Sequence, residues 1–105
     1  MKINIIITTT DSKIVVNNIT KKLLENNYSP CIQVIPKILS TYKWKNKIVK
    51  SDEILILIKT NHNNLNKCKE IILYYHNYEI PEIISGDYDI LNKEYKEWFL
   101  DNSTG

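Results

Sequence analysis

A run of five consecutive aliphatic residues, Ile54–Ile58, constrains the fold of this chain more than any other feature of its sequence. Successive side chains of a β-strand point to opposite faces of the sheet, so this strand must be covered on both faces. A second segment, Ile3–Thr9, is short and β-branched almost throughout, which favours a buried strand over a helix. The chain therefore needs a sheet whose central strands are shielded from water on either side.

Two segments carry apolar residues at helical spacing. Residues 14–26 have them at intervals of four, which predicts an amphipathic helix with Asp11 or Ser12 as its N-cap. The apolar positions of this helix are Val15, Ile19 and Leu23. A second helix is predicted after Asn61, with its apolar residues on one face: Leu65, Cys68, Ile72 and Tyr75.

The remaining segments have the composition of strands, turns and a short helix. Residues 31–44 are predicted to form a long strand that bends at Pro36, because proline cannot donate a ladder hydrogen bond. A tight turn at 45–47 leads into a return strand over 48–60. The C-terminal part is expected to contain a short strand at 82–85, a helix at 92–100 and a frayed tail at 101–105.

The order β-α-β-β-α-β plus a terminal helix predicts an α+β protein with the ferredoxin-like split βαβ fold. The two middle strands are joined by only a tight turn, so they must pair antiparallel, and a parallel sheet is excluded. A length of 105 residues allows one core, so residues 1–105 are expected to form a single domain.

The face of the sheet away from the helices constrains the oligomeric state. Such a face normally alternates to polar residues, but Ile5–Ile7 and Ile54–Ile58 present aliphatic side chains to both sides. Exposing each of them to water would forgo about 1.5–3 kcal/mol. We therefore expect a homo-oligomer with its sheets packed inward. The alternative is that the terminal helix folds back over this face.

The composition argues against several classes of function. The chain has no arginine, so it lacks the guanidinium that acylphosphatase-like enzymes of this fold use to hold phosphate. Aliphatic residues at 54–58 offer no ring on which RNA bases could stack, and a net charge of +2 is small for a nucleic-acid partner. Glycine occurs only at 86 and 105, so there is no glycine-rich phosphate loop. We expect a protein that is not an enzyme and binds no nucleic acid.

Targeting signals are also absent from the sequence pattern. No apolar stretch approaches the roughly 18 residues of a membrane-spanning helix, and the first residues lack the pattern of a cleaved signal. We therefore expect a cytoplasmic protein without a membrane partner, in which Cys31 and Cys68 stay reduced. Cys68 falls on the apolar face of the second helix and is expected in the core.

Four motifs occur in order along the chain. They are Tyr42–Trp44 before the turn, Lys59–Thr60 ending the return strand, His76–Glu82 after the second helix and Tyr95–Trp98 near the end, with Pro30–Cys31 as a further match. Together they resemble the CutA divalent-cation tolerance family over residues 3–100. The resemblance implies a ferredoxin-like homotrimer whose long middle hairpin embraces a neighbouring subunit. It also implies a role in tolerance of copper and other divalent metals, with a signalling role similar to trimeric PII proteins for some relatives.

The chain departs from the family pattern at the copper site. In bacterial relatives that site combines a Cys in the first strand with two neighbouring His after the second helix. The resemblance places Thr8 at the Cys position and Tyr75 at the first His position, so only His76 remains. Asn77 stands where the family usually has Pro, and Asn46 stands where it usually has Gly.

His76 is the strongest single metal candidate, because imidazole is the commonest transition-metal ligand, and Glu79 and Glu82 lie close in sequence. Its ring could instead anchor the turn through hydrogen bonds to the backbone. Cys31 offers a soft thiolate for Cu(I) or packs as a small buried residue. The candidate cofactor is copper or another divalent cation, with His76, Glu79 and Cys31 as ligands. His62 stands alone among asparagines and is expected to be exposed to solvent.

Aromatic residues predict a cleft at a subunit boundary, because Tyr and Trp combine apolar bulk with a polar group. The residues expected there are Tyr42, Trp44, Lys59, Tyr78, Glu82 and Trp98. The aromatics could equally be anchors of the interface, and the Lys59 ammonium could reach the surface rather than an anion site. Two functions stay open: a metal-tolerance protein that binds copper or another divalent cation, and a PII-like trimeric regulatory or scaffold protein that binds a small effector or a protein partner.

Overall fold

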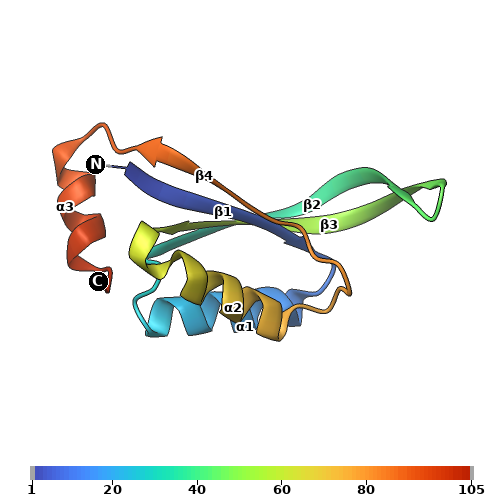
Figure 1. Cartoon of the computed structure of the whole chain (residues 1–105), viewed down its shortest axis with the longest axis horizontal. Helices are drawn as coiled ribbons and strands as arrows, with labels where there is room; N and C mark the ends of the chain where they lie inside the picture. The colour runs from blue at the N-terminus through green and yellow to red at the C-terminus, as the bar shows by residue number, and fades with distance from the viewer. Residues whose placement is uncertain (1, 105) are drawn as a thin grey trace.

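The computed structural model describes residues 2–104. Its elements are β1 (Lys2–Thr10), α1 (Lys13–Glu25), β2 (Cys31–Trp44), β3 (Lys47–Thr60), the 3-10 turn η1 (His62–Asn64), α2 (Leu65–Tyr75), β4 (Ile83–Asp89) and α3 (Lys93–Asp101). The strands form one sheet in the order β2-β3-β1-β4, with every neighbouring pair antiparallel. Figure 1 shows α1 and α2 side by side on one face of this sheet. The predicted α+β fold with a split βαβ order is therefore confirmed.

The helices form where their spacing and caps predict. The Ser12 side chain accepts a hydrogen bond from the backbone N–H of Val15 at 3.3 Å and so caps the start of α1. The residues at intervals of four in α1 are buried, as are Cys68 and Ile72 of α2. Within residues 2–104, every helix falls short of the length and hydropathy that a bilayer span requires.

A two-residue turn joins β2 to β3. Trp44 pairs with Lys47, and the backbone of Lys45 and Asn46 between them has φ of 50° and 63°. Two successive positive φ values give the type I′ geometry, whose twist matches that of the flanking strands. The hairpin extends well beyond the helices (Figure 1) and makes the molecule 46 Å long.

The predicted bend in the second strand is also confirmed. Pairing between β2 and β3 is interrupted between Ile35 and Ile38, and Lys37 has a φ of 66°. Pro36 cannot donate to the ladder, so the extra residue of a bulge is accommodated next to it. The bulge separates the part of the hairpin in the body of the protein from the part that projects.

The core lies between the helices and the sheet. Ile6 lies opposite Ile58 in the ladder, and Ile56 is two residues away on the same face. Together with the apolar faces of the helices they form one buried cluster: Ile6, Val15, Val16, Ile19, Leu23, Ile56, Ile58, Cys68 and Ile72. The alternate residues of β1 and β3 consequently point to the other face of the sheet.

That other face is apolar and open. The register places Ile7 between Leu57 of β3 and Ile84 of β4, and Ile84 is 54% exposed. The terminal helix α3 lies at one end of the sheet (Figure 1), where Lys59 meets Tyr95, and leaves most of this face uncovered. The alternative in which the terminal helix covers the sheet is therefore not what the structure shows.

Two expectations about the C-terminal part were wrong. The last strand extends to Asp89 instead of ending at residue 85, because its backbone pairs with β1 whatever the polarity of its side chains. The tail is not frayed up to Thr104, whose N–H donates to the Asn27 carbonyl at 2.8 Å and whose carbonyl accepts from Asn64 Nδ2 at 2.6 Å. Gly105 lies outside the described residues.

Candidate functional site

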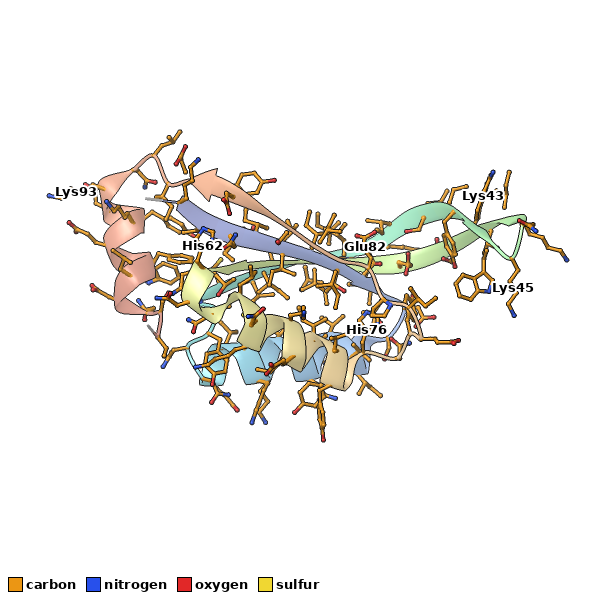
Figure 2. The ribbon with its side chains drawn as sticks, viewed as in Figure 1. Lys43, Lys45, His62, His76, Glu82 and Lys93 are labelled. Carbon is orange, nitrogen blue, oxygen red and sulfur yellow. The ribbon has the colours of Figure 1, made fainter. Side chains whose placement is uncertain are left out.

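A cleft of about 640 Å³ lies at the base of the β2–β3 hairpin. Figure 2 shows His76 and Glu82 at this place, where the hairpin leaves the body of the protein. The lining residues come from β1, the hairpin and the segment after α2: Thr9, Ser40, Thr41, Tyr42, Trp44, Val49, Glu53, Asn77, Tyr78, Glu79, Ile80 and Glu82. A volume of this size is typical of small-molecule sites.

The cleft has aromatic walls and an acidic character. Tyr42 and Trp44 project from the hairpin, while Glu53, Glu79 and Glu82 supply carboxylates, and no lysine is among the described lining residues. Carboxylates in a partly enclosed site concentrate negative potential. The cleft is therefore suited to a ligand with a positive charge or with hydrogen-bond donors.

Glu53 and Tyr78 form a hydrogen-bonded pair within this cleft. The phenolic O–H of Tyr78 donates to Oε2 of Glu53 at 2.6 Å, and Glu53 is only 7% exposed. Burial raises the pKa of Tyr78, and its hydrogen bond to the Glu53 carboxylate raises it further. In this pair the Tyr78 hydroxyl is the donor and the Glu53 carboxylate oxygen is the acceptor. Glu53 was not among the predicted site residues, because its only signal in the sequence is an acidic residue directly before the aliphatic run Ile54–Ile58.

His76 is held by the backbone through both ring nitrogens. Nε2 lies 2.8 Å from the Thr9 carbonyl oxygen, and Nδ1 accepts from the backbone N–H of Tyr78 at 3.1 Å. A carbonyl can only accept, so the proton lies on Nε2 and the ring is the neutral tautomer. This geometry favours the turn-anchoring role, since a metal at either nitrogen would replace one of these bonds. The metal role of His76 stays a prediction.

Asn77 strengthens the same turn. Its Oδ1 accepts from the Thr10 hydroxyl at 2.6 Å, and its Nδ2 donates to the Asp11 carboxylate at 2.7 Å. The segment after α2 is therefore tied to the end of β1 by side-chain bonds that a proline could not make. These bonds set the position of Tyr78 and Glu79 against the hairpin.

The six residues predicted for an intersubunit cleft fall into two groups. Tyr42, Trp44, Tyr78 and Glu82 line the cleft described above. Lys59 and Trp98 lie at the other end of the sheet, beside α3: the Lys59 Nζ is 3.4 Å from the Tyr95 hydroxyl, and the Tyr95 ring stacks on that of Trp98 with a centroid distance of 5.5 Å. One subunit does not bring all six together, and a shared cleft completed by a neighbour stays a prediction.

The two cysteines are free and have different surroundings. Cys31 is half-buried and lies opposite Lys59 in the ladder, away from His76 and Glu79. Cys68 is buried in the core, as predicted, and its burial raises the pKa of the thiol. Nowhere in residues 2–104 do three His, Cys, Asp or Glu side chains gather to hold a metal ion.

The geometry defines the class of protein: a ferredoxin-like α+β domain with a projecting hairpin and a cleft at the hairpin base. The family model for the CutA1 divalent ion tolerance protein matches residues 4–102. The chain belongs to this family, as the resemblance of its motifs predicted.

Curated relatives support this assignment. The divalent-cation tolerance protein CutA of Thermus thermophilus is 31% identical over 99 residues, which are 94% of this chain and 96% of the relative. The CutA homolog of Xenopus laevis is 34% identical over 83% of this chain. This chain spans only 58% of the Xenopus protein and 48% of mouse CutA, so these animal relatives are longer.

Solved structures agree with the fold along the whole chain. The Cut A1 protein of Thermus thermophilus superposes with a TM-score of 0.90 at 31% identity, covering 99% of this chain and all of that one. CutA1 from a psychrotrophic Shewanella superposes with a TM-score of 0.91 at 27% identity, covering 98% of this chain and 96% of that one.

Proposed function

We propose that this protein acts in the tolerance of divalent metal ions, copper among them, as a homotrimer. The observation that carries the proposal is the family match over residues 4–102, which extends across the cleft, the hairpin and the open sheet face. We assign it a binding role rather than a catalytic one. The cytoplasmic location expected from the sequence stays a prediction, which cell fractionation tests.

The open sheet face supports the oligomeric part of the proposal. Ile35 and Ile84 are about half exposed on it, and Leu55 and Leu57 lie between them. A second copy is the economical cover, because every subunit presents the same apolar surface. The number three comes from the family resemblance, and sedimentation equilibrium at micromolar concentration tests it.

The tolerance function can be tested in cells. We expect that expressing the chain in a bacterium that lacks its own CutA-family gene raises the copper concentration at which growth stops. The control is a folded, unrelated protein expressed to the same level, which shows whether protein expression alone changes growth in copper. If growth in copper and in zinc is unchanged by the chain, the proposed function is wrong.

The cleft favours a second candidate function, the binding of a small effector by a trimeric regulatory protein. Its volume, its aromatic walls and its carboxylates suit a cationic organic molecule. Such a ligand would raise the melting temperature of the protein, since it binds only the folded state. A screen of amines and nucleosides by thermal shift, repeated on Trp44→Ala, tests this function, and a screen without any Trp44-dependent shift argues against it.

A further inference from the structure

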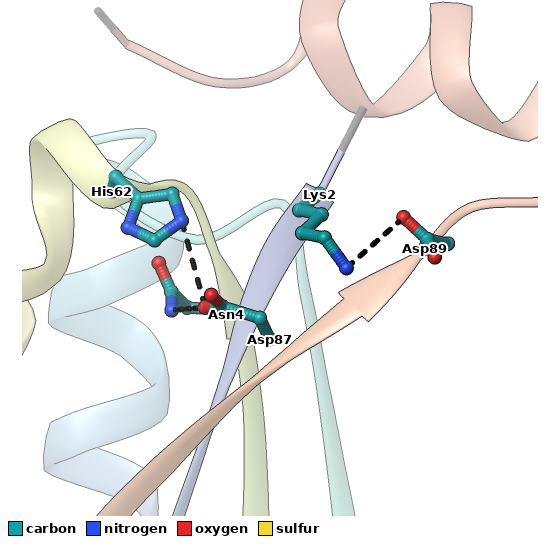
Figure 3. A network of polar contacts seen from close by, with 5 residues as sticks. All are labelled: Lys2, Asn4, His62, Asp87 and Asp89. Atoms are coloured by element: carbon teal, nitrogen blue, oxygen red, sulfur yellow. Dashed lines mark hydrogen bonds and ion pairs between the residues drawn. The ribbon is translucent and has the colours of Figure 1, made fainter.

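Three polar side chains meet at the end of the sheet near η1 (Figure 3), and Figure 2 shows His62 of this group well apart from Glu82 of the cleft. Asn4 of β1 lies opposite Asp87 of β4, so both side chains are on the helix-covered face of the sheet. Nδ2 of Asn4 donates to Oδ1 of Asp87 at 2.5 Å, and Nε2 of His62 lies 3.5 Å from the same oxygen. His62 is exposed as predicted, but it is not isolated.

The amide of Asn4 leaves a buried polar atom without a partner. Asn4 is 3% exposed, and its Oδ1 accepts no hydrogen bond from any residue in 2–104. Reversing the Asn4 amide would place its Oδ1 against the Asp87 carboxylate, where two acceptors would repel. Asp87 therefore fixes the orientation of the amide and leaves Oδ1 as the atom without a partner. Figure 3 shows this oxygen on the side of the His62 ring. A buried amide oxygen in this position needs a donor or a cation as its partner.

We propose that Asn4 Oδ1, the Asp87 carboxylate and His62 Nε2 form a three-ligand site for a divalent transition-metal ion such as Zn²⁺ or Cu²⁺. Imidazole nitrogen together with carboxylate and amide oxygens suits ions of this borderline class. The 3.5 Å between His62 Nε2 and Asp87 Oδ1 is long for a hydrogen bond. It matches the separation of about 3.4 Å between two ligand atoms that each lie about 2.1 Å from one tetrahedral ion.

The surroundings allow an ion to enter and favour its charge. The side chains of His62 and Asp87 are 59% and 46% exposed, while Asn4 forms the buried floor. The neighbouring Lys2 ammonium lies 3.6 Å from the Asp89 carboxylate, so it pairs with that residue (Figure 3). The carboxylate of Asp87 therefore remains available to a cation, and water can fill the fourth position.

This site shares no residue with the cleft or with the turn at His76, so it can be tested apart from the proposed function. The metal-free chain of residues 1–105 is titrated with Zn²⁺, and separately with Cu²⁺, by isothermal calorimetry in a buffer that does not bind metals. The variants are His62→Gln and Asp87→Asn, which keep side-chain size. The matched controls are Asp89→Asn, a neighbouring surface aspartate on the same strand, and His76→Gln.

We expect one ion per chain in the wild type and in both controls. His62→Gln and Asp87→Asn should each weaken binding by more than about tenfold, since even an outer-shell partner of a metal ligand is worth roughly 10–100-fold. Zn²⁺ should also shift the NMR signals of the His62 ring and of the Asn4 side-chain amide in the wild type. This second measurement does not require that any variant folds.

Each contrary result overturns the site. If neither ion binds, or if Asp87→Asn binds as tightly as the wild type, the three ligands do not act together. If binding depends on His62 but the Asn4 amide signals do not move, the metal is on an exposed histidine alone. If His76→Gln abolishes binding and His62→Gln does not, the metal site is at the turn after α2.

Discussion

Single side chains near the cleft are held by a few short bonds whose loss should be measurable. The buried Glu53 carboxylate accepts from the Tyr78 hydroxyl, and the Tyr78 backbone in turn donates to His76. The His76 ring in turn donates from Nε2 to the Thr9 carbonyl oxygen. The segment after α2 is thus joined to β1 and to β3 by these hydrogen bonds, so we expect the loss of any one of them to change the shape of the cleft.

Removing the Tyr78 hydroxyl is expected to destabilise the fold. Tyr78→Phe leaves the Glu53 carboxylate buried without its donor, which costs about 1–3 kcal/mol in the free energy of unfolding. Urea denaturation at pH 7 measures this change. Tyr74→Phe, at a tyrosine that is 81% exposed, is the matched control and should change stability little. Equal stability of Tyr78→Phe and wild type would show that the bond contributes nothing.

The same pair predicts a pH dependence with a definite sign. The folded state raises the pKa of Tyr78 above its usual value of about 10, because burial and Glu53 disfavour the phenolate. The raised pKa therefore adds to the free energy of unfolding below about pH 10, the pKa of tyrosine in the unfolded chain, and this contribution is lost as the pH rises further. The difference in stability between wild type and Tyr78→Phe should therefore shrink at alkaline pH, as urea unfolding across pH 7 to about 11 can show.

Cys68 should be unreactive in the native protein. Burial raises the pKa of its thiol, and only the thiolate reacts with alkylating agents. In a Cys31→Ser background, iodoacetamide at pH 8 should label the folded chain far more slowly than the chain in urea, as mass spectrometry can measure. Labelling of the native chain at the rate of a free thiol would mean that α2, which carries Cys68, opens readily.

Among the elements, the hairpin depends on its two-residue turn. Lys45 and Asn46 both have positive φ, a conformation that costs a non-glycine residue about 1–2 kcal/mol and costs asparagine less. The bulge at Lys37 then changes the direction of the hairpin before it rejoins the body. The position of Tyr42 and Trp44 on the cleft wall follows from these two features.

The free energies of unfolding of Asn46 variants should rank by how well each new residue tolerates a positive φ. Asn46→Gly is expected to keep or slightly raise the free energy of unfolding, whereas Asn46→Val should lower it by about 1–2 kcal/mol, because a β-branched residue is strained at a φ of 63°. Thermal unfolding followed by circular dichroism measures both. Ile48→Val, just past the turn at an exposed strand position, controls for a general effect of the tip.

For the molecule as a whole, the open face of the sheet is the dominant feature. The same strands bury one set of isoleucines against the helices and present Ile5, Ile7, Leu55 and Leu57 on the other side. Within residues 2–104 of a single subunit, α3 covers one end of this face and leaves most of it open. This face makes the assembled state the expected form in solution.

A charge on the open face should break the assembly. Leu57→Lys places an ammonium at the centre of this face and is expected to shift the protein to smaller species in sedimentation velocity at micromolar concentration. Ile14→Lys, on the exposed side of α1, is the control and should sediment like the wild type, because Ile14 is 72% exposed and α1 lies on the opposite face of the sheet (Figure 1). A wild type that sediments as a folded single chain would contradict the homotrimer.

Much of the fold could be predicted because its signals are local. The intervals of four in α1, the aliphatic run of β3 and the position of Pro36 depend only on residues near each other in the chain. The end of β4 and the docking of Thr104 could not be predicted, because their partners are Lys2 to Ile5 and Asn27, remote in sequence. Residue type alone made His76, Tyr78 and Glu82 candidates but could not give the distances between them.

Hydrophobic pattern and turn chemistry were enough to establish the elements, their antiparallel order and a sheet that needs cover on both faces. Which side chains meet depended on strand register and on the direction of the segment after α2. That is why Lys59 and Trp98 lie apart from Tyr42, why the His76 ring is occupied by backbone groups, and why Asn4, His62 and Asp87 come together. The physical reason is that burial is specified along the chain, whereas hydrogen bonds and charge pairs form only between groups that packing has already placed.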